Sequence, residues 1–263
     1  MKNLRTYGKP PFSLALIHGG PGAPGELAPV ARELAGNQGV LEPFQTQASL
    51  SGQIEELKEV LENYGTLPVI LAGFSWGAWL SFLFTAQYPN MIKKLILISS
   101  GSFREEYALD LEQIRLSRLS RKEQSEVESL IAILYDPDAR DKNTSFTRLG
   151  QRLSKADAYD PLNNNSEGME CQFDIFQSVW QDAEKIRKNG SLLQMGEGIT
   201  CPVIAIHGDY DSHSARGVEK PLATVVKDFR FILLEKCGHK PWLERQAREE
   251  FFRVLKEEIG KVD

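Results

Sequence analysis

The sequence has few cysteines and lacks long apolar runs. Its 263 residues include 3 cysteines, Cys171, Cys201 and Cys237. Because the number is odd and no spacing suits a metal site, we do not expect a disulfide framework. We expect reduced, buried thiols instead. The apolar run at 12–18 is too short for a signal-peptide core or a membrane span, and no later run is long enough either. We therefore expect a cytoplasmic protein with no membrane span.

An excess of basic charge is also missing. The chain has 31 Lys and Arg against 36 Asp and Glu, a formal net charge of -5 and a pI near 5.6. A surface that tracks phosphates needs clustered Lys and Arg, so nucleic acid is not an expected partner. The basic stretch KIRKNG, residues 185–190, is interpreted as a solvated helix end. With 41% hydrophobic residues, the composition suits one large domain or a core with an insertion.

Short apolar runs alternate with helical patterns along most of the chain. Such runs are typical of strands buried on both faces of a mostly parallel sheet. The predicted strands are 12–18, 40–45, 68–73, 94–99, 202–207 and 230–235. Helices are predicted at 28–36, 51–65, 76–89 and 242–260, and a weaker one at 214–228, which Pro221 interrupts. The fold class is therefore α/β, a doubly wound sheet of about six strands with helices on both faces.

A long segment between the fourth and fifth predicted strands, residues 102–198, has helical stretches and no convincing strand. Ser120 and Glu123 form a capping-box pattern before one of these stretches. An insertion at this point lies at the carboxyl ends of the strands, where open α/β sheets bind ligands. We expect a core of residues 1–101 and 199–263, with residues 102–198 as a helical cap over the crevice.

One serine lies between two glycines where a predicted strand is followed by a predicted helix. The pentapeptide GFSWG, residues 73–77, would occur by chance in about one chain in ten of this size and composition. Its position adds weight, because the glycines permit the sharp turn that leaves a serine hydroxyl exposed at the top of the sheet. Ser75 is therefore the candidate nucleophile, and a helix-start cap is its structural alternative.

A serine nucleophile needs a base and an orienting acid. His239 follows the last predicted strand, in a loop at the same edge of the sheet as Ser75. Asp211 follows another strand, which gives the chain order Ser, Asp, His. Asp209 is the rival acid, but it also suits a turn residue. No catalytic role is assigned to the remaining histidines. His18 and His207 are interpreted as structural, and His213 is a loop residue whose role is left open.

The oxyanion that develops during acyl transfer needs two preorganised backbone donors. Trp76 follows the nucleophile and supplies the first amide. The loop HGGPG, residues 18–22, follows an earlier strand and is the expected source of the second. Since Pro21 has no amide hydrogen, this donor is assigned to Gly20.

A dinucleotide site is one competing interpretation. The segment GPGAPG, residues 20–25, follows a strand, and Glu42 comes near the end of the next one, as in a dinucleotide-binding unit. Against it, the prolines remove backbone donors, and Pro29 suits a helix that begins near Ala28, beyond the glycines. A pyrophosphate would then lack the helix N-terminus that it requires.

A metal site is the other competing interpretation. In HGDYDSH the alternating residues are possible ligands: His207, Asp209, Asp211 and His213. On a straight strand they would share one face, but the glycine-containing turn breaks the alternation and no further cluster completes a ligand shell. Neither a metal nor a cofactor is expected.

Four motifs, in order, resemble the α/β-hydrolase superfamily and, within it, the proline iminopeptidase-like branch. They are HGGPG at 18–22, GFSWG at 73–77, HGDYD at 207–211 and GHKPWLE at 238–244. The resemblance covers nearly the whole chain and implies an α/β-hydrolase fold with an inserted helical cap and a serine hydrolase that needs no cofactor. The usual strands before the HGG strand do not fit in the residues available, so a shortened sheet is expected. Residues 41–52 replace the branch's Asp-Gln-Arg-Gly-type loop.

The resemblance implies either an aminopeptidase of the proline iminopeptidase type or a carboxylesterase or lipase acting on a small acyl ester. The expected partner is accordingly a small-molecule or short-peptide substrate. Carboxylates that could hold a free ammonium group are Glu167, Glu170 and Asp174, and apolar side chains that could hold an acyl group are Phe173, Phe176 and Trp180. Both sets also suit ordinary helix positions. A protein of this fold that only binds a ligand is a further alternative.

Overall fold

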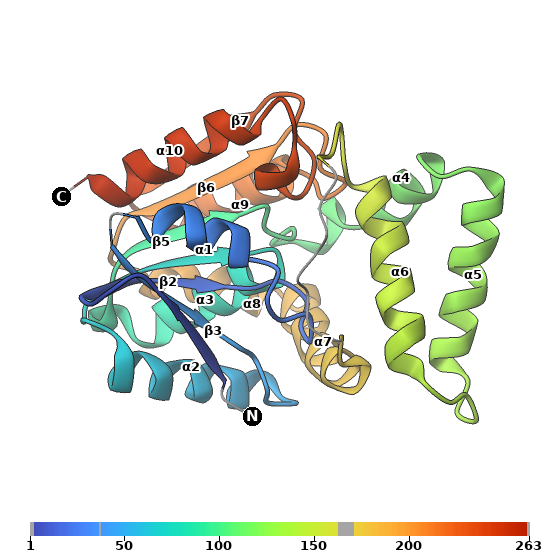
Figure 1. Ribbon diagram of the computed structural model, residues 1–263, viewed down its shortest axis with the longest axis horizontal. Coiled ribbons are helices and arrows are strands. Elements are labelled where there is room, and N and C mark those ends of the chain that lie inside the picture. Colours follow the sequence, from blue (N-terminus) through green and yellow to red (C-terminus); the bar gives the residue numbers. More distant parts are fainter. Residues whose placement is uncertain (1–2, 37, 163–170, 262–263) are drawn as a thin grey trace.

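A computed structural model describes residues 3–36, 38–162 and 171–261 and shows a layered α/β fold (Figure 1). One sheet has the strand order β1-β3-β2-β4-β5-β6-β7. Its strands are β1 (Leu4–Tyr7), β2 (Phe12–Ile17), β3 (Gly39–Pro43), β4 (Val69–Phe74), β5 (Ile92–Ile98), β6 (Val203–Gly208) and β7 (Phe229–Leu234). Only β1 is antiparallel to its neighbour, β3. The predicted α/β-hydrolase type of sheet is confirmed.

The sheet has one strand more than the six predicted, because one short strand does fit before the HGG strand. The additional strand, β1, has only 4 residues. It fits into the short N-terminal segment because it adds to the free edge of β3, with Leu4 opposite Pro43. A strand of this length shows too little alternation to be recognised in a sequence. The six predicted strands all agree with the structure within two residues at each end.

Helices cover both faces of the sheet (Figure 1). One face carries α1 (Ala28–Leu34) and α10 (Arg248–Gly260), and the other carries α2 (Leu50–Tyr64), α3 (Trp76–Gln87) and α9 (Arg216–Val225). Each face buries its own apolar cluster. The helix α9 continues through Pro221. The carbonyl of Gly217, which a proline four residues later cannot bond, accepts the N–H of Phe103 instead, at 2.9 Å.

The described part of the segment between β5 and β6 is helical. Its helices are α4 (Leu111–Ser117), α5 (Arg121–Tyr135), α6 (Lys142–Ala156), α7 (Phe173–Lys188) and α8 (Ser191–Gln194). We call α4 to α6 the arm: it packs around a small apolar core that also includes Phe173 at the start of α7, and Figure 1 shows α5 and α6 side by side and away from the sheet. In contrast, α7 and α8 contribute to the cluster around α3. The cap boundaries 102–198 stay a prediction, whereas the capping box of Ser120 and Glu123 is confirmed.

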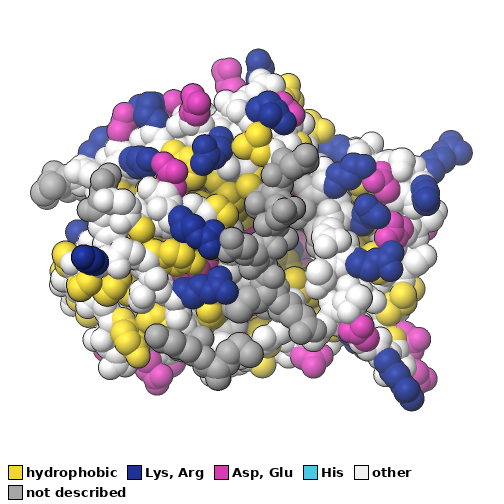
Figure 2. All heavy atoms as spheres, viewed as in Figure 1, with side chains coloured by type: hydrophobic (Ala, Val, Ile, Leu, Met, Phe, Trp, Pro, Cys, Tyr) yellow, Lys and Arg dark blue, Asp and Glu magenta, His cyan; other side chains and the backbone are white. Residues whose placement is uncertain are grey.

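The surface mixes charges of both signs. Figure 2 shows Lys and Arg side chains interspersed with Asp and Glu and with apolar side chains on the face that it presents. In the residues that the structure describes, no helix is both long enough and apolar enough to cross a membrane.

Cys201 and Cys237 are buried thiols, and burial raises the pKa of Cys201 to about 11.

Candidate active site

Ser75 lies on a sharp turn between β4 and α3. Its backbone has φ 53° and ψ -116°, in a region that residues with side chains seldom adopt. Both flanking glycines are needed: a Cβ on Gly73 would overlap the carbonyl of Gly77, and a Cβ on Gly77 would overlap the carbonyl of Ile17. The N–H of Ser75 donates to the carbonyl of Ile98 at 2.9 Å, which ties the turn to β5. This is the strand–turn–helix setting of a nucleophile elbow.

Two loops at the same edge bring His239 and Asp211 to Ser75. Asp211 follows β6 and His239 follows β7. The Nε2 atom of His239 lies 3.1 Å from Oγ of Ser75, and its Nδ1 atom lies 2.7 Å from Oδ2 of Asp211. With the proton on Nδ1, the imidazole donates to the carboxylate and accepts from the hydroxyl. The three residues predicted to be catalytic thus form one continuous hydrogen-bonded chain.

Asp209, the rival acid, faces a different group. Its Oδ1 atom accepts the N–H of Cys237 at 3.0 Å, and its own N–H donates to the carbonyl of Leu234 at 2.9 Å. Asp209 therefore supports the backbone of the loop that carries His239, while Asp211 contacts the imidazole itself.

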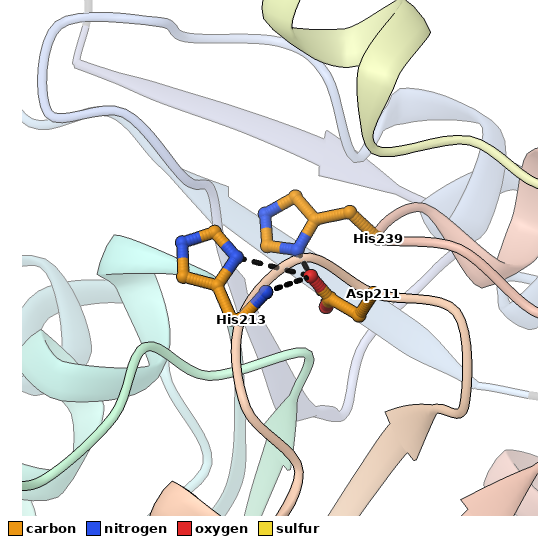
Figure 3. A group of neighbouring side chains, drawn as sticks. All are labelled: Asp211, His213 and His239. Atoms are coloured by element: carbon orange, nitrogen blue, oxygen red, sulfur yellow. Dashed lines mark hydrogen bonds and ion pairs between the residues drawn. The ribbon is translucent and has the colours of Figure 1, made fainter. Parts of the chain in front are cut away.

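Three imidazoles surround the carboxylate of Asp211. His213 donates its backbone N–H to Oδ1 at 2.9 Å and places its Nδ1 atom 3.0 Å from the same oxygen, as Figure 3 shows. The Nε2 atom of His207 lies 3.5 Å from Oδ2. Burial raises the pKa of Asp211, but the charges of His239, His207 and His213 outweigh it and hold this pKa well below its usual range. Burial also lowers the pKa of His213 to about 4.

The stability of the protein is expected to fall as the pH falls from about 6.5 to about 4. The pKa of His213 is about 4 in the folded chain, whereas an exposed imidazole has a pKa of about 6.5. Between these values the unfolded chain binds more protons, so His213 lowers the free energy of unfolding by up to about 1.4 kcal/mol per pH unit. Urea unfolding at several pH values measures this slope. His213→Asn should reduce the slope, and an identical slope in the variant would contradict the assignment.

The predicted oxyanion donors lie on the two loops beside the nucleophile. Trp76 is the first residue of α3, where backbone N–H groups have no partner within the helix. Its ring is engaged separately, since Nε1 donates to Oε1 of Gln53 at 3.2 Å. In the HGGPG loop the N–H of Gly19 donates to Oε1 of Glu26 at 2.8 Å, which leaves Gly20 as the next donor. Gly20 has φ 109°, a conformation that suits glycine. Both oxyanion roles stay predictions.

A small pocket of about 40 Å³ opens beside Ser75. Its walls include the rings of Trp79 and Trp180, which are parallel with centroids 5.9 Å apart. The imidazole of His213 also lines it. Of the residues predicted to contact a substrate, Trp180 therefore lines the same pocket as the candidate nucleophile.

The other residues predicted to contact a substrate have different surroundings. Phe173 is buried in the apolar core of the arm. Phe176 lies between Phe146 and Trp180, with ring centroids 4.6 and 5.9 Å away. Asp174 is exposed on the first turn of α7. Glu167 and Glu170 lie outside the described residues.

His213 and Arg187 are among the residues of the pocket that were not predicted to belong to the site. Arg187 is part of the stretch interpreted as a solvated helix end, and that interpretation is corrected for this residue, which is only 9% exposed. Its Nε atom donates to Oε2 of Glu105 at 2.8 Å, and its guanidinium lies 5.7 Å from the ring of Trp79. The signal in the sequence was its spacing, since Arg187 follows Trp180 by two helical turns and so shares its face.

The segment after α6 holds the loop that carries His239. The N–H of His239 donates to the carbonyl of Asp157 at 2.9 Å. The buried carboxylate of Glu244 accepts three N–H groups, at 3.1, 2.9 and 2.8 Å, from Gly238, Tyr159 and Asp160. Because the chain before α10 makes these contacts, the helix begins at Arg248. The predicted start at residue 242 is therefore wrong.

Glu244→Ala is expected to lower the free energy of unfolding by about 3 kcal/mol, because three amides lose their acceptor. Urea denaturation followed by circular dichroism measures the change. Glu249→Ala is the matched control, since Glu249 is exposed on α10, and its effect should stay within about 0.5 kcal/mol. Equal effects of the two substitutions would contradict the role given to Glu244.

One group of donor atoms could hold a metal ion in the part of the chain that the structure describes. The ligand atoms of Asp211, His213 and His239 lie within 4.8 Å of one another. This group differs from the alternating pattern considered in the sequence, because Asp209 bonds the Cys237 amide instead. Its short N···O contacts are those of hydrogen bonds between imidazoles and a carboxylate, so they do not depend on an ion.

The layout of a dinucleotide site does not form around residues 20–25. The helix α1 begins at Ala28, with Pro29 in its first turn, as the sequence predicted. Glu42 is buried, and its Oε2 atom accepts the hydroxyl of Tyr7 at 2.6 Å. The glycines therefore lack an adjacent helix start, and the acidic residue is engaged within the sheet.

Residues 15–246 match the profile of a protein family described as serine aminopeptidase, S33. No curated protein sequence matches the chain. Similar solved structures include an α/β fold family hydrolase from Bacillus anthracis str. Sterne, with a TM-score of 0.70 and 13% identity over 97% of this chain and 94% of that chain. A proline iminopeptidase from Mycobacterium smegmatis gives 0.61 and 16% over 97% and 93%. The 2-hydroxy-6-oxo-6-phenylhexa-2,4-dienoate hydrolase from Rhodococcus sp. strain RHA1 gives 0.65 and 19% over 97% and 92%. At these identities the likeness is one of fold.

Proposed function

The chain belongs to the serine aminopeptidase S33 family of α/β-hydrolases, and from this premise we propose that it is a serine hydrolase that cleaves a small ester or amide through an acyl-enzyme. The observation that carries the proposal is the hydrogen-bonded chain from Ser75 through His239 to Asp211, with contacts of 3.1 and 2.7 Å. A serine in a strained elbow, a base within reach of it and a buried acid behind the base are the parts that nucleophilic acyl transfer needs.

Each residue has a distinct role in the proposed reaction. The Oγ atom of Ser75 attacks the carbonyl carbon while its proton passes to Nε2 of His239, and Asp211 stabilises the imidazolium. The amides of Gly20 and Trp76 donate to the oxyanion. When the tetrahedral intermediate collapses, the bond to the leaving group breaks and the leaving group takes the proton from His239. Water, deprotonated by the same imidazole, then releases the acid and restores the serine.

Two substrate classes are compatible with this mechanism: an aminopeptidase substrate of the proline iminopeptidase type, and a small acyl ester as for a carboxylesterase or lipase. The pocket favours the ester. Its described lining includes the rings of Trp79 and Trp180 but no carboxylate to hold a free ammonium group. The cation in the lining, Arg187, is paired with Glu105. Assays of amino-acid anilides beside short and long acyl esters separate the two classes.

Labelling with a fluorophosphonate probe tests the proposed nucleophile. We expect a covalent adduct on Ser75 of the folded protein, located by mass spectrometry of its peptides, because the probe reacts with serines activated by a base. Ser75→Ala is the control and should not be labelled. A folded wild-type protein that takes up no label at Ser75 would instead favour a protein of this fold that only binds a ligand.

A further inference from the structure

Two nearly parallel imidazoles share the carboxylate of Asp211. The rings of His213 and His239 are stacked, with centroids 4.6 Å apart and planes 25° from parallel. His213 places Nδ1 3.0 Å from Oδ1, and His239 places Nδ1 2.7 Å from Oδ2. An ionised carboxylate only accepts hydrogen bonds, so it holds the proton of each neutral ring on Nδ1 and leaves a lone pair on each Nε2.

The two Nε2 atoms differ in what they face. In Figure 3 both lie on the side of their ring that is turned away from Asp211. That of His239 meets the hydroxyl of Ser75 at 3.1 Å. Among the described residues, the Nε2 atom of His213 has no hydrogen-bond partner. It does not belong to the fully buried side-chain atoms that lack a partner, so this atom is not fully buried. Since the His213 side chain is 14% exposed and lines the pocket beside Ser75, its lone pair is available to a molecule in that pocket.

We propose, resting on the function proposed above, that His213 binds the substrate: its Nε2 atom accepts a hydrogen bond from a hydroxyl group on the carbon next to the scissile carbonyl. A group on that carbon is two bonds from the atom that Ser75 attacks. The ring centroid of His213 lies 4.6 Å from that of His239, the proposed base. The Nε2 lone pairs of the two rings can therefore bond neighbouring groups of one substrate. The preferred substrates are then esters or amides of 2-hydroxy acids.

His213 also orients Asp211, and the test must separate this effect from substrate binding. A residue that only positions the carboxylate would affect every substrate alike. A residue that bonds a substrate hydroxyl affects only those substrates that carry the hydroxyl. The discriminating quantity is therefore the ratio of kcat/KM for two esters that differ in this one donor.

His213→Asn is the appropriate variant, because the asparagine amide can donate to Asp211 as Nδ1–H does but offers nothing at the place of Nε2. Methyl lactate and methyl 2-methoxypropanoate are the substrate pair, and the acid released is followed by pH-stat titration. We expect the ratio of kcat/KM, hydroxy over methoxy ester, to fall about threefold to tenfold in the variant. Ser102→Ala, which alters the same pocket, is the control and should leave the ratio unchanged.

An unchanged ratio in His213→Asn, or an equal loss of activity on both esters, would overturn the assignment. A wild-type protein that cleaves neither ester and takes up no fluorophosphonate would refute the proposed function separately. The inference is then decided by binding, with lactamide and 2-methoxypropanamide titrated into protein whose histidines carry ¹⁵N. A shift of the His213 Nε2 signal with lactamide alone supports the assignment, and equal shifts with both amides, or no shift with either, contradict it.

Discussion

Ser75→Ala is expected to lower kcat by about six orders of magnitude on any ester or amide that the wild-type protein cleaves. Without Oγ no acyl-enzyme forms, and the Nε2 atom of His239, which lies 3.1 Å from that oxygen, has no hydroxyl to deprotonate. The residual activity of the variant then comes from stabilisation of the oxyanion and binding of the substrate. The measurement compares kcat of the two proteins, together with the burst of leaving group that acyl-enzyme formation produces.

The comparison needs a variant that loses a serine hydroxyl away from the chemistry. Ser178 is exposed on α7, so Ser178→Ala should keep kcat within a factor of two and show an undiminished burst. Retention of activity within tenfold in Ser75→Ala, in protein freed of wild-type contamination, would show that the proposed mechanism is wrong.

The positions of the candidate triad could be predicted because each residue directly follows a strand with a strong apolar pattern. Ser75 follows β4, Asp211 follows β6 and His239 follows β7. Parallel strands place their carboxyl ends at one edge of a sheet, so recognising the strands was enough to bring these three residues together. The glycines of GFSWG added a local constraint, since the turn leaves no room for a Cβ at Gly73 or Gly77.

The remaining parts of the site depend on polar contacts, which apolar patterns do not reveal. Arg187 is buried because it pairs with Glu105, which lies 82 residues away in the chain. The side chain of His213 faces the pocket because its Nδ1 atom and its backbone N–H both bond Asp211. The buried carboxylate of Glu244 has its partners in a segment beyond the end of α6. Arg187 and Glu244 are placed by partners distant in the sequence and His213 by a neighbouring carboxylate, whereas apolar periodicity reports only helices and strands.

Asp211→Asn, which removes the proposed catalytic acid, is expected to lower kcat by about four orders of magnitude. Asp211 accepts from Nδ1 of His239 at 2.7 Å and so keeps the lone pair on Nε2, toward the serine. An asparagine amide that turns its NH₂ group toward Nδ1 reverses this tautomer, and Nε2 then carries a proton and cannot accept one from Ser75. The lost negative charge also removes the stabilisation of the imidazolium. Steady-state kinetics at pH 7 on the best ester measures the loss.

Asp209→Asn is the matched control, the same substitution two residues earlier. The carboxylate of Asp209 accepts one backbone N–H, from Cys237, and the carbonyl oxygen of an asparagine can accept the same bond. We therefore expect kcat to fall by less than about tenfold in this variant. If Asp209→Asn instead costs more than Asp211→Asn, the rival acid is the catalytic one. The loop after β6 would then have to rearrange before it could orient His239, because in the structure only Asp211 of the two aspartates contacts that ring.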